Sequence, residues 1–179
     1  MNSSNVGICG YWKNNVWTAL PTLDPTKHSA AVSLVLSGSD FYAAGYSTNA
    51  SSVMVAGYWK NGIWTALTPL DPTKDSEVDS MIVSGTDVYA GGWSTNTSNA
   101  QVPGYWKNGV WTALPTLDPT KNSGAHSLAI SGSDFYAAGY STNSSSVMVP
   151  GYWKNGIWTA LTPLDPAKGG TVLSVVVAQ

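Results

Sequence analysis

Arginine is absent from this chain, and charge of either sign is scarce. Eight lysines stand against ten acidic residues, and charged residues make up 10% of the sequence, compared with about 25% in an average soluble domain. A protein that follows nucleic-acid phosphates needs a dense basic surface, so this composition argues against nucleic-acid binding. The sequence also lacks an apolar run of the roughly 18 to 20 residues that would cross a bilayer. Its first residues show no basic start followed by an apolar stretch, so we expect no membrane span and no signal peptide.

Cysteine occurs once, as Cys9, which excludes an internal disulfide and leaves the compartment open. The two histidines and this cysteine lie at unrelated positions, without the spacing of zinc ligands, so we reject a zinc site. Aromatic residues, in contrast, are abundant, with nine Trp and nine Tyr. So many large rings exclude a disordered chain.

The chain is a tandem repeat with a period of 47 residues. The tripeptide Gly-Tyr-Trp begins four times, at Gly10, Gly57, Gly104 and Gly151. Residues 41–74 match residues 135–168 at all but three of 34 positions. Such near-identity indicates recent duplication or deliberate design.

Every local signal within one unit predicts β structure, and no segment has a helical period. Four strands are expected in the last complete unit, at residues 126–131, 135–141, 147–153 and 157–161. Asn155-Gly156 between the last two is a strong hairpin signal, because both residues accept a positive φ. Four short strands in 47 residues fit a β-propeller blade, which takes about 40 to 50 residues. The predicted fold class is all-β, a propeller or partial propeller.

The unit resembles a kelch-type propeller blade. The similarity rests on an aliphatic strand with a small Gly-containing doublet (Val88–Gly92), followed by Tyr105 and Trp111 flanking the last hairpin. The chain is also similar to uncharacterised bacterial propeller-like proteins with Tyr-Trp-Lys-Asn-Gly repeats. The other copies depart from the kelch pattern, with Ala44-Gly45 and Ala138-Gly139 in place of Gly-Gly. The resemblance implies a ring of radial blades that binds proteins or sugars, with no common catalytic residue.

The predicted domain is a single repeat array over residues 1–179, with an incomplete closing blade. Its expected parts are a partial blade at 1–29 with the third and fourth strands, full blades at 30–76, 77–123 and 124–170, and a closing inner strand at 171–179. Four complete units of 47 residues would need 188 residues, nine more than the chain has, and a second strand is missing. An unpaired apolar strand favours association. We therefore expect self-association as a homo-oligomer, a rearranged closing blade, or a fragment of a longer repeat protein.

Lysines and most aspartates recur at fixed positions of every unit, which favours a structural role in turns. Differences between copies concentrate instead at alternate positions where the first strand begins. Six polar residues there are the candidate ligand-binding residues: His28, Asp75, Glu77, Asp79, Asn122 and His126. A period of two places alternate residues on one face of a strand. In a propeller, as the resemblance implies, this face lines the mouth of the central channel, where a ligand binds or where residues drift freely.

Two chemistries are conceivable on this face. Asp75, Glu77 and Asp79 could present oxygen ligands to calcium, although three adjacent carboxylates more often form a solvated patch. His126 stands one unit after Asp79, and a His–Asp pair suits acid–base chemistry. No nucleophile is identifiable near the pair in the sequence, so we expect no catalytic residue, no enzyme and no cofactor other than this calcium.

Aromatic residues at one repeated position offer a different site. Tyr46, Trp93 and Tyr140 lie beside polar Ser-Thr-Asn loops and could stack on sugar rings. The remaining aromatic residues are expected in the core. The sequence thus predicts a non-enzymatic binding or scaffold module whose partner is a protein or a carbohydrate. A multivalent lectin, or a designed or truncated repeat protein without an evolved ligand, are the alternatives.

Overall fold

The computed structural model describes residues 5–178, and every regular element in that range is a β-strand. The strands form four antiparallel sheets, numbered here I to IV in chain order. Sheet I contains β1 (Gly10–Lys13) and β2 (Val16–Ala19). Sheet II contains β3 (Ser29–Ser37), β4 (Asp40–Thr48), β5 (Met54–Lys60) and β6 (Ile63–Ala66). Sheet III contains β7 (Ser76–Ser84), β8 (Asp87–Thr95), β9 (Gln101–Lys107) and β10 (Val110–Ala113). Sheet IV contains β11 (Gly124–Ser131), β12 (Asp134–Thr142), β13 (Met148–Lys154) and β14 (Ile157–Ala160).

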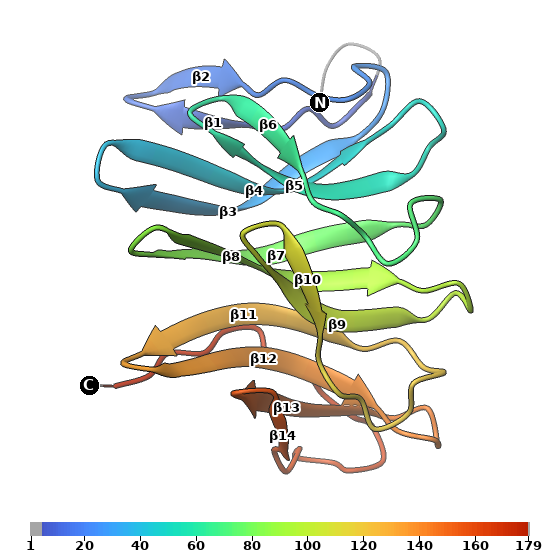
Figure 1. Cartoon of the computed structure of the whole chain (residues 1–179). Helices are drawn as coiled ribbons and strands as arrows, with labels where there is room; N and C mark the ends of the chain where they lie inside the picture. The colour runs from blue at the N-terminus through green and yellow to red at the C-terminus, as the bar shows by residue number, and fades with distance from the viewer. Residues whose placement is uncertain (1–4, 179) are drawn as a thin grey trace.

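The sheets are stacked on one another in chain order (Figure 1). Within each of sheets II to IV the strands follow one another as a simple meander. A separate apolar core fills each junction between neighbouring sheets. Each core contains one fully buried tryptophan, which is Trp59, Trp106 or Trp153 in chain order. Within residues 5–178 no helix is long and apolar enough to cross a membrane.

The two last strands of each sheet are joined by the predicted two-residue turn. Asn155 and Gly156 both have a positive φ, at 51° and 82°, as this mirror-image turn requires. The same conformation recurs at Asn61-Gly62 and Asn108-Gly109. Asparagine and glycine are the residues that tolerate it. The repeated Asn-Gly dipeptide therefore fixes the register of the outer hairpin in sheets II to IV.

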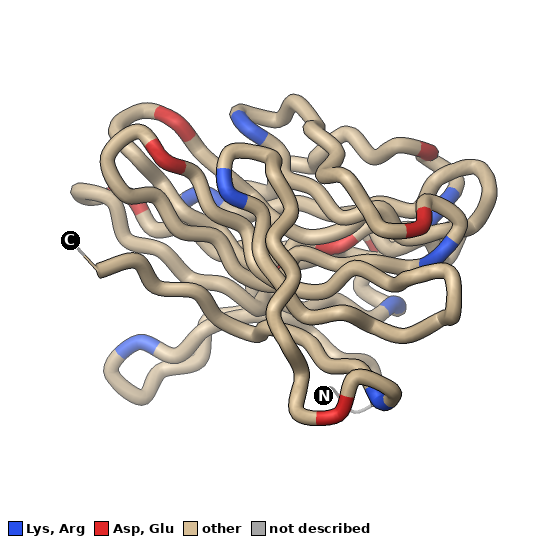
Figure 2. Tube along the Cα trace, turned by 90° about the horizontal axis from the view of Figure 1, so that it is seen from below, with Lys and Arg blue, Asp and Glu red and all other residues tan. Residues whose placement is uncertain are grey.

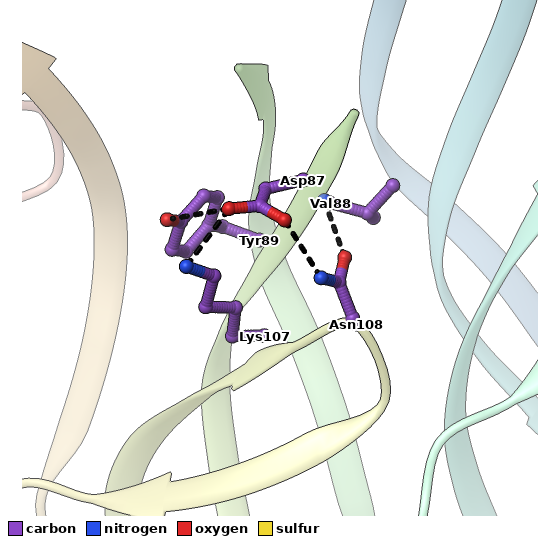
Figure 3. A network of polar contacts seen from close by, with 5 residues as sticks. All are labelled: Asp87, Val88, Tyr89, Lys107 and Asn108. Atoms are coloured by element: carbon purple, nitrogen blue, oxygen red, sulfur yellow. Dashed lines mark hydrogen bonds and ion pairs between the residues drawn. The ribbon is translucent and has the colours of Figure 1, made fainter. Parts of the chain in front are cut away.

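The lysine before the turn and the aspartate that begins the second strand form a repeated polar network (Figure 3). In sheet III, Lys107 Nζ lies 2.8 Å from Asp87 Oδ2, and Asn108 Nδ2 donates to Asp87 Oδ1. The side-chain oxygen of Asn108 accepts the amide of Val88 at 2.9 Å. The hydrogen bond from Lys107 is the main cause that lowers the pKa of the Asp87 carboxyl. Equivalent networks occur in sheets II and IV, so these charges hold a hairpin, as their repetition predicts.

The four predicted strands of the last unit are confirmed within one or two residues, as β11 to β14. The closing inner strand expected at 171–179 does not form, since residues 171–178 adopt no regular structure. That segment would pair with the missing second strand, and a segment without a paired neighbour forms no ladder.

Candidate functional site

The inner strands β3, β7 and β11 follow one another through the stack and share one irregularity. Each contains a β-bulge, where the pairing with the following strand slips by one residue. Directly after the bulge, the Ser33 hydroxyl accepts the amide of Met81 at 3.0 Å, and Ser80 accepts that of Leu128 at 3.1 Å. These bonds join residues 48 apart in the sequence. Equivalent positions of neighbouring sheets are therefore held side by side.

The bulge residues of sheets III and IV are Asp79 and His126, and they form a pair. His126 Nδ1 lies 2.9 Å from Asp79 Oδ2. An ionised carboxylate can only accept, so the imidazole donates its Nδ1–H, and Nε2 stays available to a ligand. The His126 ring also contacts the ring of Tyr140, with 5.6 Å between centroids. Among residues 5–178, no serine, threonine or cysteine is hydrogen-bonded to this imidazole, so the pair has no adjacent nucleophile to activate.

Glu77 extends the pair towards sheet II. It lies two residues before Asp79 on β7, opposite Trp93 of β8. Burial raises the pKa of its carboxyl from 4.5 to about 7, the negative charge of Asp79 adds to the rise, and His126 opposes it. The pKa of the Tyr46 phenol is raised by burial and further by the charge of Glu77. Near neutral pH the Glu77 carboxyl is therefore present both as a donor and as an acceptor.

Together these residues form a line across sheets II, III and IV, which we call the polar row. It consists of Tyr46, Glu77, Asp79, His126 and Tyr140. All five side chains are half-buried, so they are ordered by packing but still reach solvent. Lysines lie elsewhere, mainly in turns at the edge of the molecule (Figure 2). Two carboxyls, an imidazole and two phenols can hydrogen-bond a polar ligand and offer aromatic surface to it.

A shallow pocket of about 410 Å³ adjoins the polar row at Tyr140. Its lining comes from the loop before β11 and from β12 and the start of β13: Thr120, Lys121, Asn122, Tyr140, Thr142, Ser146 and Met148. Sequence comparison between copies singled out Asn122 and Tyr140. It missed Lys121 and Thr142, because both recur in other units and therefore resemble scaffold.

Three of the candidate residues have a local task instead. His28 Nδ1 accepts the Gly7 amide at 3.0 Å, Asp75 Oδ1 accepts the Met54 amide at 2.8 Å, and Asn122 Oδ1 accepts that of Gln101 at 2.9 Å. The bonds of Asp75 and Asn122 tie the residues that precede one sheet to the third strand of the sheet before it, and the bond of His28 reaches Gly7, which precedes β1. These three side chains thus bond to backbone rather than to the polar row. Their differing identities are compatible with one role, because each presents one acceptor at the same place.

The three carboxylates expected to bind calcium do not converge. Asp75 is engaged with the start of β5, while Glu77 and Asp79 belong to the polar row. Within residues 5–178, no group of three or more His, Cys, Asp or Glu side chains could hold a metal ion.

The three aromatic residues expected to stack on sugars occupy equivalent places on the second strand of each sheet. Tyr46 lies opposite Ala30, Trp93 opposite Glu77 and Tyr140 opposite Gly124. Because Gly124 has no side chain, it leaves open the space beside Tyr140, where a Cβ atom would lie 3.1 Å from the ring. No protein-family profile matches the chain, and no curated protein matches its sequence. The fold defines it as an all-β repeat protein of stacked four-stranded antiparallel sheets.

Proposed function

We propose that this protein is a non-enzymatic binding module built of kelch-type propeller blades, and that its ligand binds along the polar row. One observation carries the proposal: at inner-strand positions where the copies differ, Asp79 and His126 bond to each other rather than to the backbone of a neighbouring sheet. Sheet II has Ala30 and Val32 where sheet III has Glu77 and Asp79. Hydrogen-bonding chemistry is thus added to an otherwise repeated frame at one place.

The chemistry of the polar row favours binding over catalysis. His126 and Asp79 form an acid–base pair, but turnover also needs a group that attacks or is activated. A half-buried row of donors and acceptors beside aromatic rings instead suits recognition of a polar, extended ligand such as a peptide. The row crosses three sheets, so a ligand several residues long can contact all of them.

A peptide array tests this proposal with the purified chain. We expect a subset of peptides to bind, and the double variant Asp79→Ala/His126→Ala to lose at least tenfold in affinity, because two partners are removed together. Lys154→Ala is the matched control, since this lysine belongs to the outer hairpin of the same sheet. Far-UV circular dichroism establishes that each variant is folded. A blank array, or binding that ignores the double variant, would contradict the proposal.

A carbohydrate is the second candidate ligand, favoured by the pocket at Tyr140. A half-buried tyrosine ring beside amide, hydroxyl and ammonium groups can stack on a pyranose and bond its hydroxyls. A glycan array run with and without calcium decides between the two. Sugar-selective binding that is lost in Tyr140→Ala would identify a lectin, and dependence on calcium would assign a metal-binding role to Glu77 and Asp79.

A further inference from the structure

Because the units repeat, the exposure of a residue in an end sheet can be compared with that of the equivalent residue in the middle of the stack. Trp12 of sheet I is 71% exposed, whereas the equivalent tryptophans of sheets II, III and IV are each 0% exposed. Leu34 on β3 is 58% exposed, against 3% for Met81 at the same position of β7. Surface that is buried at every internal junction is therefore uncovered on sheets I and II.

This uncovered surface is a groove of about 570 Å³, which we call the N-terminal face. It is lined mainly by Tyr11, Trp12, Leu34, Leu36 and Phe41. Among the lining residues within 5–178, Lys13 alone is charged. A groove of this size and apolarity is costly to leave in water, and it sits where a preceding sheet would pack.

The other end of the stack has the complementary exposure. Leu161, after β14, is 44% exposed, whereas the equivalent leucines after β2, β6 and β10 are between 2% and 4% exposed. Val176, on the segment that follows sheet IV, is 88% exposed, whereas Val35 and Ile82 at the equivalent positions pack against the cores of the junctions that follow them. We call Leu161, Ser174 and Val176 the C-terminal face. It is what a following sheet would cover.

Two hydrogen bonds repeat at the internal junctions and define their register. A serine hydroxyl of one inner strand accepts an amide 48 residues later, as in Ser80 and Leu128. A tryptophan indole donates to a carbonyl 38 residues earlier, as in Trp106 and Thr68 at 2.7 Å. The same indole bond is made by the equivalent tryptophans of sheets II and IV.

The C-terminal segment already occupies the place of an inner strand. The Val175 amide donates to the Ser127 hydroxyl at 3.1 Å, which is the serine bond of the other junctions. Ser174, 47 residues after Ser127, is therefore the next serine in the series, and it is exposed. In the part of the chain that the structure describes, no serine hydroxyl accepts the amide of Leu34. The C-terminal end of the stack therefore presents the Ser174 hydroxyl as an acceptor, and the N-terminal end presents the Leu34 amide as a donor, for the same type of hydrogen bond.

We propose that the C-terminal face of one copy docks on the N-terminal face of a second copy, head to tail, in the register that joins sheets within the chain. The Ser174 hydroxyl then accepts the amide of Leu34. The Trp12 indole donates to the carbonyl of Thr162, the next residue in the series of Thr68. Leu161 packs on Trp12, as its equivalents pack on the buried tryptophans.

The occupant is a second copy because the two faces lie at opposite ends of the stack (Figure 1). Such a contact uses different surfaces on its two partners, so it builds either a closed ring or an open chain of copies. The joint holds an inner segment and an outer hairpin with no second strand between them, so it is weaker than an internal junction. This inference does not depend on what binds the polar row.

Light scattering coupled to size-exclusion chromatography tests the proposal by mixing two variants. Trp12→Lys breaks only the N-terminal face, and Val176→Lys breaks only the C-terminal face. We expect the wild type to give multiples of 18.8 kDa and each variant alone to be a monomer. An equimolar mixture should restore one intact junction and form a dimer. Ile63→Lys is the control, because this residue is exposed on an outer strand and belongs to neither face.

Hydrogen exchange provides a second measurement that needs no substitution. Protection of the Leu34 amide should rise with the concentration of wild-type protein, while that of Met81 should stay constant. A wild type that is monomeric at all concentrations would overturn the inference. So would a mixture of folded variants that stays monomeric, or an oligomer that survives both substitutions.

Discussion

The ionisation of Glu77 near neutral pH depends strongly on its surroundings. This residue is the only glutamate in the chain, and the equivalent residues in sheets II and IV are Ala30 and Gly124. Half-buried beside Asp79, its carboxyl has a pKa of about 7. The folded state therefore binds this proton between pH 4.5 and 7, whereas the unfolded chain has already released it. Stability must fall as pH rises through that window.

The substitution Glu77→Gln should remove this dependence. At pH 8 we expect the variant to be more stable than the wild type by about 1–2 kcal/mol, since the carboxyl is partly reached by solvent. Near pH 4.5 the two should be equally stable, because both then carry a neutral side chain. Denaturant unfolding followed by tryptophan fluorescence at the two pH values measures the difference.

Carbon-13 NMR of the same carboxyl gives an independent check. Because the chain has a single glutamate, its resonance can be assigned by comparison with the Glu77→Gln variant alone. Titration near the ordinary value of 4.5 would show that Glu77 is solvated and would refute this description of the polar row.

At the scale of the elements, the β-bulge of each inner strand requires one glycine on the second strand. A Cβ atom at Gly92 would overlap the carbonyl oxygen of Glu77, and the same overlap occurs at Gly45 and Gly139. Backbone carbonyls in a paired strand cannot move aside. The preceding residue is different, because Gly91 stands where the other sheets have Ala44 and Ala138. The three atoms nearest to a Cβ at Gly91 all belong to the Leu128 side chain.

Two neighbouring glycines therefore make a matched test. Gly92→Ala should destabilise the protein by about 2–3 kcal/mol, because it forces the bulge apart. Gly91→Ala should change stability by less than about 1 kcal/mol, because Leu128 can adopt another rotamer. Midpoints of urea unfolding compare the two. Equal effects of both substitutions would mean that the bulge does not depend on Gly92.

Most of the elements could be predicted from the sequence, since alternation and the Asn-Gly turns act locally. The β-bulges could not be predicted. No particular residue type marks the extra residue at Asp79, and the slip shows only in how β7 pairs with β8. For the same reason, the prediction that the alternate residues at the start of each inner strand lie on one face holds only for some of them. Asp75 turns to cap a neighbouring strand, while Glu77 and Asp79 join the polar row.

The candidate site was predictable only where copies differ. His126 and Asp79 stood out as non-repeated residues at equivalent positions, and the 47-residue period predicted that they are neighbours in adjacent units. The contact of His126 with Tyr140, and the pocket beyond it, depend on packing between β11 and β12. The failure of residues 171–178 to form a strand depends on a partner that the chain does not contain.

At the scale of the whole molecule, stability arises at the junctions between sheets. Each sheet packs only on the sheets next to it, so the array approximates a one-dimensional stack. Equivalent residues in such a stack differ mainly in whether a neighbouring sheet covers them. The repeat makes this measurable, because the same tryptophan occurs at the end of the stack and inside it. Trp106 is fully buried and donates a hydrogen bond, whereas Trp12 is largely exposed.

Replacing Trp106 or Trp12 by alanine should therefore lower the free energy of unfolding by different amounts, and only the effect at Trp12 should depend on protein concentration. Trp106→Ala should cost about 3–5 kcal/mol at any protein concentration, because it empties an internal core. Trp12→Ala should cost less than about 1 kcal/mol in dilute, monomeric protein. Its cost should grow as concentration rises, since docking of a second copy buries Trp12 and stabilises the folded state by mass action. Unfolding curves at several concentrations measure both, and a constant small cost for Trp12→Ala would show that sheet I stays uncovered in solution.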